Sequence, residues 1–348
     1  MNTRTRSESA VTPTKPVDAL EIFSTCPPSS TSDTLTYLKE VIEIAQWSEE
    51  AGCTGILVYS DNSLVDPWLV AQVIIENTRQ LAPLVAVQPV YMHPYMLAKK
   101  VASLGFMYGR KIYLNMVAGG FKNDLLALDD TTPHDRRYDR LAEYTTIIKK
   151  LLLNEGPLTM AGDFYRVENL KLAPALPDTL LPEIFISGSS EAGLAAAKTI
   201  GATAIHYPKP ATDYAEADID PAVDAGIRIG IICREVADHA WAVARQRFPE
   251  DRKGQLTHQM AMKVSDSVWH KQLSELAANS SDNNPYWLVP FQNYKTMCPY
   301  LVGDYETVGR ELKRYYDLGY QTFILDVPGS MEDLVHIRKA FDRVNQAG

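Results

Sequence analysis

The sequence predicts an α/β protein in which residues 19–348 form a closed barrel of eight parallel strands, each followed by a helix. Apolar runs alternate with amphipathic segments of helical spacing along most of the 348 residues, which is typical of βα units. Several apolar runs end in small polar residues, the pattern of a buried parallel strand leading into a ligand-binding loop. Because periodicity alone cannot prove that the sheet closes, an open doubly wound sheet is the alternative.

Eight short apolar runs, each bounded by turn residues or followed by a helical pattern, are expected to form the barrel strands. They are residues 20–24, 55–59, 83–87, 111–116, 183–187, 202–207, 227–233 and 321–326. The expected helices place apolar residues three and four positions apart. They are residues 34–50, 67–79, 94–107, 135–153, 190–200, 235–247, 305–318 and 331–344. Pro67 and Pro94 open two of them, and proline suits a first helical turn because it has no amide proton to leave unpaired.

Two insertions interrupt the expected repeat. Within residues 155–180, Gly162 and Asp163 separate two short β-like runs, which indicates a hairpin before the fifth strand. Within residues 248–300, a helical pattern at 260–276 precedes a polar loop and several aromatic residues. Insertions on the functional face of a barrel often form lids, although packing on the barrel rim would explain the aromatic residues equally well. Residues 1–18 are rich in Ser, Thr, Pro and charge, which predicts a disordered tail.

Composition and charge favour a small-molecule role in the cytoplasm. The formal net charge is −9 and no basic stripe occurs, which disfavours a nucleic-acid or anionic-membrane partner. The sequence contains neither an apolar run long enough for a membrane span nor the hydrophobic core of a signal peptide. The four cysteines lack CxxC spacing, as expected of reduced thiols, and the seven histidines show no spacing that predicts a metal site.

The runs at 114–120 and 184–190 carry most of the functional information. In the second run, Gly188, Ser189 and Ser190 come directly before an expected helix, so their exposed amides and two hydroxyls could receive a phosphate. This pattern suggests a phosphorylated cofactor. Serine is also a common helix cap, and from the residues alone capping explains Ser189 and Ser190 equally well.

A set of short motifs, in matching order along the chain, resembles the bacterial luciferase-like flavin monooxygenases and, among them, most closely the alkanesulfonate monooxygenase branch. The motifs are AGCTGIL at 51–57, DPWLVA at 66–71, NMVAG at 115–119, RY at 137–138, GSS at 188–190, GIR at 226–228 and LVGD at 301–304. The resemblance implies a barrel that binds reduced FMN from a separate NAD(P)H:flavin reductase and uses O2 to form a flavin peroxide that oxygenates a small organic substrate. We also expect a homo-oligomer, either a dimer or a tetramer.

The resemblance implies that six residues contact FMN. They are Asn115, Ala118, Tyr138, Gly188, Ser189 and Ser190. Among them, Asn115 would lie near the reactive edge of the isoalloxazine ring. Structural roles are the alternatives: Asn115 at a strand end could satisfy a neighbouring turn, and Tyr138 in a helix could be an ordinary core aromatic.

Candidate catalytic residues are Asn115, His206 and Arg228. His206 is the first to test, because it lies at the end of the sixth expected strand and the pKa of histidine allows proton transfer near neutral pH. A structural histidine is the alternative. Candidate substrate and lid residues are Leu64, Tyr91, His93, Tyr294 and Lys295, with Gln88 and Tyr207 as further polar lining.

Departures from the sulfonate enzymes bear on the substrate. By the same resemblance, Leu64 stands where those enzymes carry a cysteine, Gly230 replaces a histidine, and a tyrosine falls on or near Pro328. Their lid arginine aligns near Tyr294, and Arg228 alone of that polar set is retained. A sulfonate needs charge-assisted donors to offset its desolvation, so these replacements argue against alkanesulfonate cleavage and favour a neutral or weakly polar substrate.

Three functions remain open on the sequence. The first is a two-component monooxygenase that uses reduced FMN. The second is an oxidoreductase that uses a deazaflavin for hydride transfer, as related barrels do. The third is a flavin-binding protein without turnover, which the lost polar residues make credible. Whether the substrate is free or bound to a carrier stays open.

Overall fold

The computed structural model of the chain describes residues 20–119, 122–188, 190–215, 220–264, 268–277 and 285–346. The tail expected at 1–18 lies outside these residues, as does Ser189 of the expected phosphate loop. Among the helices in the described ranges, none is both long and apolar enough to cross a membrane.

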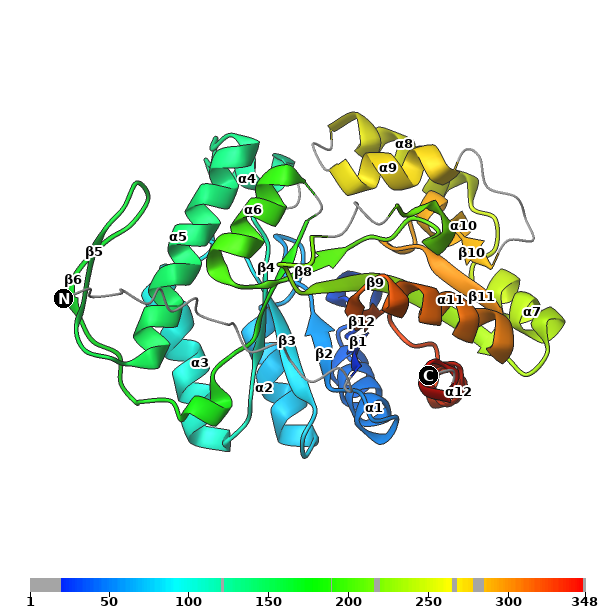
Figure 1. Cartoon of the computed structure of the whole chain (residues 1–348), viewed down its shortest axis with the longest axis horizontal. Coiled ribbons are helices and arrows are strands. Elements are labelled where there is room, and N and C mark those ends of the chain that lie inside the picture. The colour runs from blue at the N-terminus through cyan, green and yellow to red at the C-terminus, as the bar shows by residue number, and fades with distance from the viewer. Residues whose placement is uncertain are drawn as a thin grey trace, which may run out of the picture.

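Eight parallel strands close into a barrel (Figure 1). They are β1 (Glu21–Thr25), β2 (Gly55–Val58), β3 (Ala82–Val87), β4 (Tyr113–Met116), β7 (Ile184–Ser187), β8 (Thr203–His206), β9 (Ala225–Arg234) and β12 (Tyr320–Leu325). Consecutive strands of this series pair side by side, β12 pairs with both β9 and β1, and the pairing of β8 with β9 completes the ring. The predicted barrel is therefore confirmed over the open sheet.

Helices follow the barrel strands and cover the outside of the ring (Figure 1). They are α1 (Tyr37–Glu50), α2 (Pro67–Asn77), α3 (Pro94–Tyr108), the short α4 (Lys122–Ala127), α5 (His134–Leu153), α6 (Glu191–Ile200), α7 (Ala237–Arg247), α11 (Tyr305–Asp317) and α12 (Met331–Gln346). Side chains before the two prolines cap α2 and α3: Asp66 accepts from the Trp68 amide and His93 accepts from the Tyr95 amide.

The interior of the barrel is a packed aromatic and aliphatic core. Phe23 packs edge to face against Tyr113 and Phe185, with ring centroids 5.1 and 5.3 Å apart, and Leu57 and Leu84 are buried beside them. A filled interior leaves no channel through the barrel. Ligands must therefore bind at the ends of the strands, where the loops leave the core.

The hairpin expected before the fifth barrel strand is present. Strands β5 (Leu158–Ala161) and β6 (Arg166–Leu170) pair antiparallel. The carboxylate of Glu143 on α5 accepts hydrogen bonds from the backbone amides of three consecutive residues in the turn, Asp163, Phe164 and Tyr165. These bonds attach the turn to the barrel, which indicates a structural role for the hairpin.

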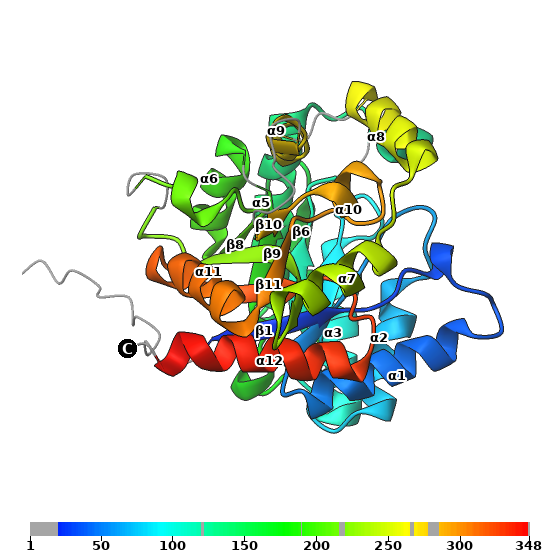
Figure 2. The same ribbon diagram turned by 90° about the vertical axis from the view of Figure 1, so that its right-hand side faces the viewer.

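The second insertion differs in detail from the sequence prediction. The single helix expected at 260–276 is two helices, α8 (Arg252–Val264) and α9 (Val268–Ala277), followed by β10 (Tyr286–Trp287) and α10 (Val289–Gln292). In both ribbon views α8 and α9 lie at the side of the molecule opposite α1 and α2 (Figures 1 and 2).

Strands β10 and β11 were not predicted. Strand β11 (Tyr300–Asp304) runs parallel to the second half of β9, while the first half of β9 pairs within the barrel. The ten-residue β9 therefore extends beyond the ring, and β10 and β11 join the insertion to it. The apolar run at 300–304 directly precedes the helix expected at 305–318, but it begins where the predicted insertion ends and was not assigned as a strand.

Candidate functional site

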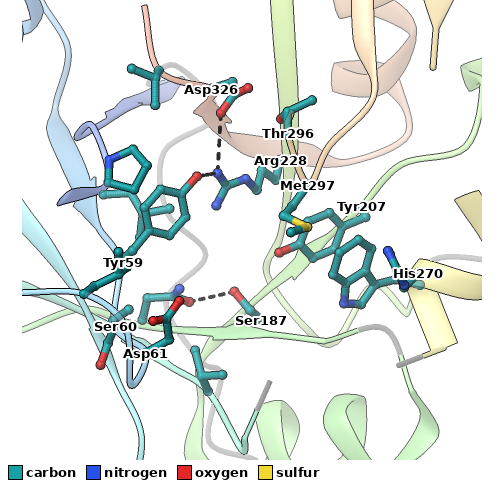
Figure 3. Close-up of a pocket in the computed structure, with 18 of the residues that line it drawn as sticks. Tyr59, Ser60, Asp61, Ser187, Tyr207, Arg228, His270, Thr296, Met297 and Asp326 are labelled. Atoms are coloured by element: carbon teal, nitrogen blue, oxygen red, sulfur yellow. Dashed lines mark hydrogen bonds and ion pairs between the residues drawn. The ribbon is translucent and has the colours of Figure 1, made fainter. Parts of the chain in front are cut away.

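A cavity of about 600 Å³ opens at the carboxyl ends of the barrel strands (Figure 3). Its wall is formed by the loops that follow the barrel strands and by the second insertion. Its lining includes Tyr59, Leu64, Gln88, Asn115, Ala118, Tyr138, Ser187, Gly188, Ser190, Tyr207, Arg228, Arg247, Trp269, His270, Tyr294, Lys295 and Asp326. Several residues far apart in the sequence thus meet in one space, as the barrel topology predicts.

At one end of the cavity, Tyr138 of α5 meets the loop between β7 and α6. Gly188 has a φ of +152°, and a Cβ atom there would lie 2.7 Å from the Tyr138 hydroxyl oxygen, so only glycine fits this approach. Ser190 caps α6, because its Oγ accepts from the Gly193 amide at 3.1 Å. As an acceptor in this bond, the Ser190 hydroxyl can still donate its own proton into the cavity.

This end has the features of a phosphate cradle. The first amides of α6 have no partners within the helix, and the helix dipole favours an anion at this position. The hydroxyls of Tyr138 and Ser190 line the same part of the wall. The two interpretations of Ser190 are compatible. Its Oγ lone pair accepts the capping hydrogen bond, whereas its O–H can donate a hydrogen bond to an anion.

Asn115 and Ala118 line the cavity beside this cradle, on and just after β4. Asn115 is buried, and its amide oxygen accepts from the Ser187 hydroxyl at 2.9 Å. This bond fixes the orientation of the amide group. A rigid amide at a strand end can direct a hydrogen bond to a planar ring lying in the cavity.

The other end of the cavity holds a buried charged group on β9. Arg228 donates from Nη2 to the Tyr59 hydroxyl, and the same nitrogen lies 3.7 Å from Oδ1 of Asp326 (Figure 3). The guanidinium also lies over the Tyr59 ring, 4.9 Å from its centroid. Burial alone would lower the pKa of Arg228, but its tyrosine, cysteine and carboxylate neighbours outweigh burial and raise that pKa well above its ordinary value.

Tyr300, which the sequence analysis missed, completes this group. Its hydroxyl donates to Oδ2 of Asp326 at 2.7 Å. A Cβ atom at Gly230 would lie 2.3 Å from the Tyr300 ring, so the glycine that replaces a histidine of the sulfonate enzymes makes room for this tyrosine. Asp326 was within reach of the sequence, because it is the last residue of the eighth expected strand, where barrel enzymes place their chemistry.

Three other candidates fall at or beyond the edge of the cavity. Leu64 lines the cavity, but Tyr91 lies behind Gln88, from which its hydroxyl accepts a hydrogen bond at 3.3 Å. His93 caps α3, and its ring packs against Tyr165 with centroids 5.9 Å apart. Tyr91 and His93 are therefore separated from a bound ligand by other side chains.

His206 lies outside the lining of the cavity. Its ring packs against Tyr320 with centroids 5.7 Å apart, and burial lowers its pKa to about 4. The next residue, Tyr207, lines the cavity instead. The alternation of side chains along a strand gave no sign of which of the two neighbours points inward. A proton-transfer role for His206 stays a prediction.

The second insertion closes one side of the cavity. The Trp269 ring of α9 stacks on Tyr207 at a centroid distance of 3.7 Å, and Tyr294 and Lys295 line the wall nearby. Lys295 forms an ion pair with Asp251 at 2.7 Å. In the sequence, nothing marks Trp269 beyond its place in the helix predicted at 260–276.

A metal centre is not indicated by these side chains. Within the described ranges, no three His, Cys, Asp or Glu residues are grouped so that they could hold a metal ion. Among the described residues, the most buried polar side chains of the lining are the amides of Gln88 and Asn115, the Arg228 guanidinium, the His270 imidazole, the Thr296 hydroxyl and the Asp326 carboxylate, a set suited to organic ligands.

Comparison with known proteins identifies the family. The family described as luciferase-like monooxygenase matches residues 20–322. A relative, the 4-(γ-L-glutamylamino)butanoyl-[BtrI acyl-carrier protein] monooxygenase BtrO of Niallia circulans, is 36% identical over 317 residues, which cover 89% of this chain and 91% of BtrO.

Two solved structures share the fold at low sequence identity. Riboflavin lyase RcaE, solved with modified FMN and its substrate riboflavin, superimposes with a TM-score of 0.72 at 15% identity, covering 95% of this chain and 92% of its own. An F420-dependent secondary alcohol dehydrogenase, in complex with an F420–acetone adduct, gives a TM-score of 0.64 at 17% identity, covering 94% and 99%. With its family match over most of its length and its close relative BtrO, the chain belongs to the luciferase-like monooxygenases.

Proposed function

We propose that the protein is a two-component monooxygenase that uses reduced FMN and O2 to oxygenate an acyl chain. Reduced FMN comes from a separate NAD(P)H:flavin reductase, and the reaction takes place in the cytoplasm. The observation that carries the proposal is the cradle of Tyr138, Gly188 and Ser190 in the wall of the cavity. It has the donors, the close backbone approach and the helix end that the phosphate of FMN requires.

The described residues fit FMN at both of its ends. Tyr138, Ser190 and the first amides of α6 would hold the phosphate, and the 2.7 Å approach of a Gly188 Cβ to the Tyr138 hydroxyl explains why no side chain is present there. Asn115, held by Ser187, would meet the ring. Ser189 is proposed as a further phosphate donor on the resemblance alone.

When bound, reduced FMN supplies the two electrons that O2 needs for oxygenation. A C–H bond of the substrate becomes C–O–H, the second oxygen atom leaves as water, and FMN is released in its oxidised form. The balanced reaction is substrate–H plus O2 plus FMNH2, giving substrate–OH plus H2O plus FMN. Because O2 and the electrons of reduced FMN would supply the redox chemistry, the protein needs few acid or base groups.

The side chains of this chain bind, orient and shield the reactants. Trp269 and Tyr207 close one wall with stacked apolar faces, and Asn115 presents a fixed amide in the wall of the cavity. Exclusion of water protects reactive species and strengthens every polar contact inside the site. We propose that Tyr294 and Lys295 belong to this closing wall.

The proposed class of substrate follows from the similarity to BtrO. The printed name of BtrO describes an acyl group carried on an acyl-carrier protein. The two chains share 36% identity over most of their lengths, so we propose that this protein also oxygenates an acyl thioester bound to a carrier. The apolar Leu64 at the cavity wall and the loss of the polar residues of the sulfonate enzymes are consistent with an acyl chain rather than an alkanesulfonate.

We also propose that the enzyme is a homo-oligomer, either a dimer or a tetramer. Three large apolar side chains on α2 and α3 are exposed: Leu69 at 61%, Phe106 at 71% and Met107 at 60%. Such side chains favour burial against another surface. Sedimentation velocity at micromolar protein tests the proposal, and a monomer throughout would contradict it.

The experiment that tests the function is a single turnover without a reductase. Enzyme is mixed anaerobically with photochemically reduced FMN and a short acyl pantetheine thioester, and O2 is then added. The proposal predicts one hydroxylated product for each FMNH2 that is productively oxidised, detected by mass spectrometry. In parallel, reduced F420 replaces FMNH2, with and without O2.

Each result separates the three candidate functions. Product that requires both FMNH2 and O2 supports the proposal. Substrate conversion by reduced F420 in the absence of O2 would instead indicate the hydride-transferring oxidoreductase, a function that occurs on this fold. Tight FMN binding with no conversion of any thioester would indicate a flavin-binding protein without turnover.

A further inference from the structure

Opposite charges face each other in the wall of the cavity without forming a close pair. Arg228 and Asp326 have side-chain exposures of only 5% and 11%, yet their nearest nitrogen and oxygen atoms are 3.7 Å apart. A direct charge-assisted hydrogen bond is roughly 2.7–2.9 Å long. Within the described part of the chain, the Nε–H of Arg228 has no hydrogen-bond partner. That Nε–H is buried away from the cavity, so the bonding capacity that a ligand can use is that of the loosely paired guanidinium Nη atoms and the Asp326 carboxylate, which line the cavity.

This arrangement is expensive if only an apolar chain occupies the cavity. An unpaired buried donor and a loosely paired carboxylate both lose hydration without full compensation. Tyr59 and Tyr300 satisfy part of the demand, one at Arg228 and one at Asp326. A ligand that accepts from the guanidinium and donates to the carboxylate would supply the rest.

A second guanidinium lies at the same end. Arg247 lines the cavity, donates to the Val327 carbonyl, and lies 3.5 Å from Asp333. Asp333 is already paired with Arg234 at 2.5 Å. Arg247 thus shares its carboxylate partner with another arginine. The local balance is positive, which favours a ligand that brings a carboxylate.

The proposed substrate also has a direction. An acyl chain attached to a carrier must enter past exposed residues of the lining, which include Ser30 and Thr31, and its free end travels furthest inward. The most deeply buried charged groups of the lining, Arg228 and Asp326, are placed to meet that free end.

We infer that this end of the cavity is a subsite for a zwitterionic α-amino-acid head group at the free end of the acyl chain. The carboxylate of the head group binds Arg228, with Arg247 nearby, and its ammonium group binds Asp326. The inference rests on the proposed function, which supplies the acyl thioester. The name of BtrO describes a γ-L-glutamyl group at that free end, which carries an α-carboxylate and an α-ammonium group. The inference goes further by assigning the residues of this chain that would recognise such a head group.

Other head groups fit this end less well. An unsubstituted alkyl end leaves the guanidinium and the carboxylate unsatisfied. A sulfonate would pair with Arg228 but would also lie against the Asp326 carboxylate, which repels it. Only a group that carries both charges on neighbouring atoms matches both residues.

The test uses wild-type enzyme and four pantetheine thioesters of equal length. Their free ends carry the carboxylate and the ammonium group, the carboxylate alone, the ammonium group alone, or neither. Binding is measured by calorimetry in the presence of oxidised FMN, and oxygenated product is measured separately. We expect the zwitterionic thioester to bind about tenfold more tightly than the thioester that lacks the ammonium group. The thioester that lacks the carboxylate should bind more weakly still, because the site has excess positive charge.

The binding and product measurements distinguish failure of the head-group inference from failure of the proposed function. Equal affinity for all four thioesters would overturn the head-group inference, whether or not product forms. The predicted order of affinities with no product from any thioester would support the subsite and contradict the proposed function. Preference for the uncharged thioester would show that Arg228 and Asp326 have only a structural role.

Two variants test whether Asp326 binds the ammonium group of the head group. Asp326→Asn keeps the shape of the side chain and should abolish the advantage of the ammonium group while preserving that of the carboxylate. Asp251→Asn removes a carboxylate from an ion pair outside the lining and should leave the whole order unchanged. If Asp326→Asn keeps the full preference for the ammonium group, the assignment is wrong. If that variant does not fold, the wild-type thioester series alone decides the inference.

Discussion

The Trp269 indole stacks face to face on the Tyr207 phenol, with ring centroids 3.7 Å apart and planes inclined by 11°. Trp269 belongs to α9 of the second insertion, and Tyr207 follows β8 of the barrel. The contact therefore joins the insertion to the rigid part of the molecule at the wall of the cavity. A ring contact of this kind is worth about 0.5–1.5 kcal/mol beyond the apolar area that it buries.

The insertion is expected to protect the reaction through Lys295. Lys295→Ala should lower the product formed per FMNH2 consumed and raise hydrogen peroxide, while FMN affinity changes little, because a looser wall admits water. Its ion pair with Asp251 is half exposed at the lysine end, so the free energy of unfolding should change by less than about 1 kcal/mol. Stopped-flow oxidation with peroxide and product assays measures the coupling.

Asp251→Ala is the matched control for this prediction, since it breaks the same ion pair and leaves the lysine in place. Unchanged coupling in Lys295→Ala would remove this residue from the site. An equal loss of product per FMNH2 in both variants would show that the Lys295–Asp251 ion pair only holds the insertion in place.

Phosphate recognition is expected to dominate flavin affinity. Reduced FMN should bind much more tightly than riboflavin, and Tyr138→Phe or the double Ser189→Ala, Ser190→Ala variant should weaken FMN binding by about 1–3 kcal/mol, the scale of hydrogen bonds to a charged group. Riboflavin affinity should stay the same. Anaerobic fluorescence titration measures both.

Tyr144→Phe is the control for Tyr138→Phe. It removes a hydroxyl from the same helix, at a fully buried position outside the cavity lining. Equal affinity of the wild-type enzyme for FMN and riboflavin would refute the cradle. Native circular dichroism with unchanged FMN affinity in the serine variant would leave Ser190 as a helix cap only.

Alkanesulfonates should not be cleaved. With a flavin reductase, NAD(P)H and micromolar enzyme, no sulfite above background is expected from simple alkanesulfonates. Leu64 offers no polar contact, the space at Gly230 is filled by the Tyr300 ring, and Asp326 repels an anion near Arg228. A thiol reagent detects sulfite directly, and rapid release would contradict this account of the cavity.

Acid should destabilise the second insertion through His270. This residue is 3% exposed, its ring lies 5.1 Å from that of His258, and burial together with His258 lowers its pKa from about 6.5 to about 4. The unfolded chain therefore binds a proton between those pH values that the folded chain does not. Stability should fall as pH decreases from 6.5 to 4, by up to about 3 kcal/mol from this group.

Thermal unfolding from pH 7 to pH 4.5 checks this sign. His270→Leu should lose part of the acid sensitivity, whereas His239→Leu, on the exposed side of α7, should retain it. Identical pH dependence in the wild type and in His270→Leu would contradict the assignment.

The regular part of the fold was predictable because each βα unit leaves a local pattern. Buried parallel strands such as β2 and β7 are continuous apolar runs, and Pro67 and Pro94 mark helix starts, so the expected bounds agree with the structure to within a few residues. Strand β11 was missed, because it depends on pairing with the distant second half of β9 rather than on any pattern of its own.

The sequence predicted the part of the site that a local motif marks. It did not predict the residues that only tertiary packing brings to the cavity. The loop at Gly188 and Ser190 stands out, because small residues before a helix are a local signal. Arg247 and Trp269 lie in ordinary helical patterns, and only the packing of the insertion brings them to the cavity. His206 and Tyr207 are neighbours, and which of them faces inward depends on the twist of the strand end, which the sequence does not reveal.

The most direct test of the central claim follows the oxygen atom. A single turnover with reduced FMN, a carrier-bound acyl thioester and isotopically heavy O2 in ordinary water is analysed by mass spectrometry of the released acyl group. The account predicts that one heavy oxygen atom enters the product for each molecule converted, and that omission of FMNH2 abolishes the reaction. Product that carries oxygen from water, or conversion that continues without O2, would contradict it.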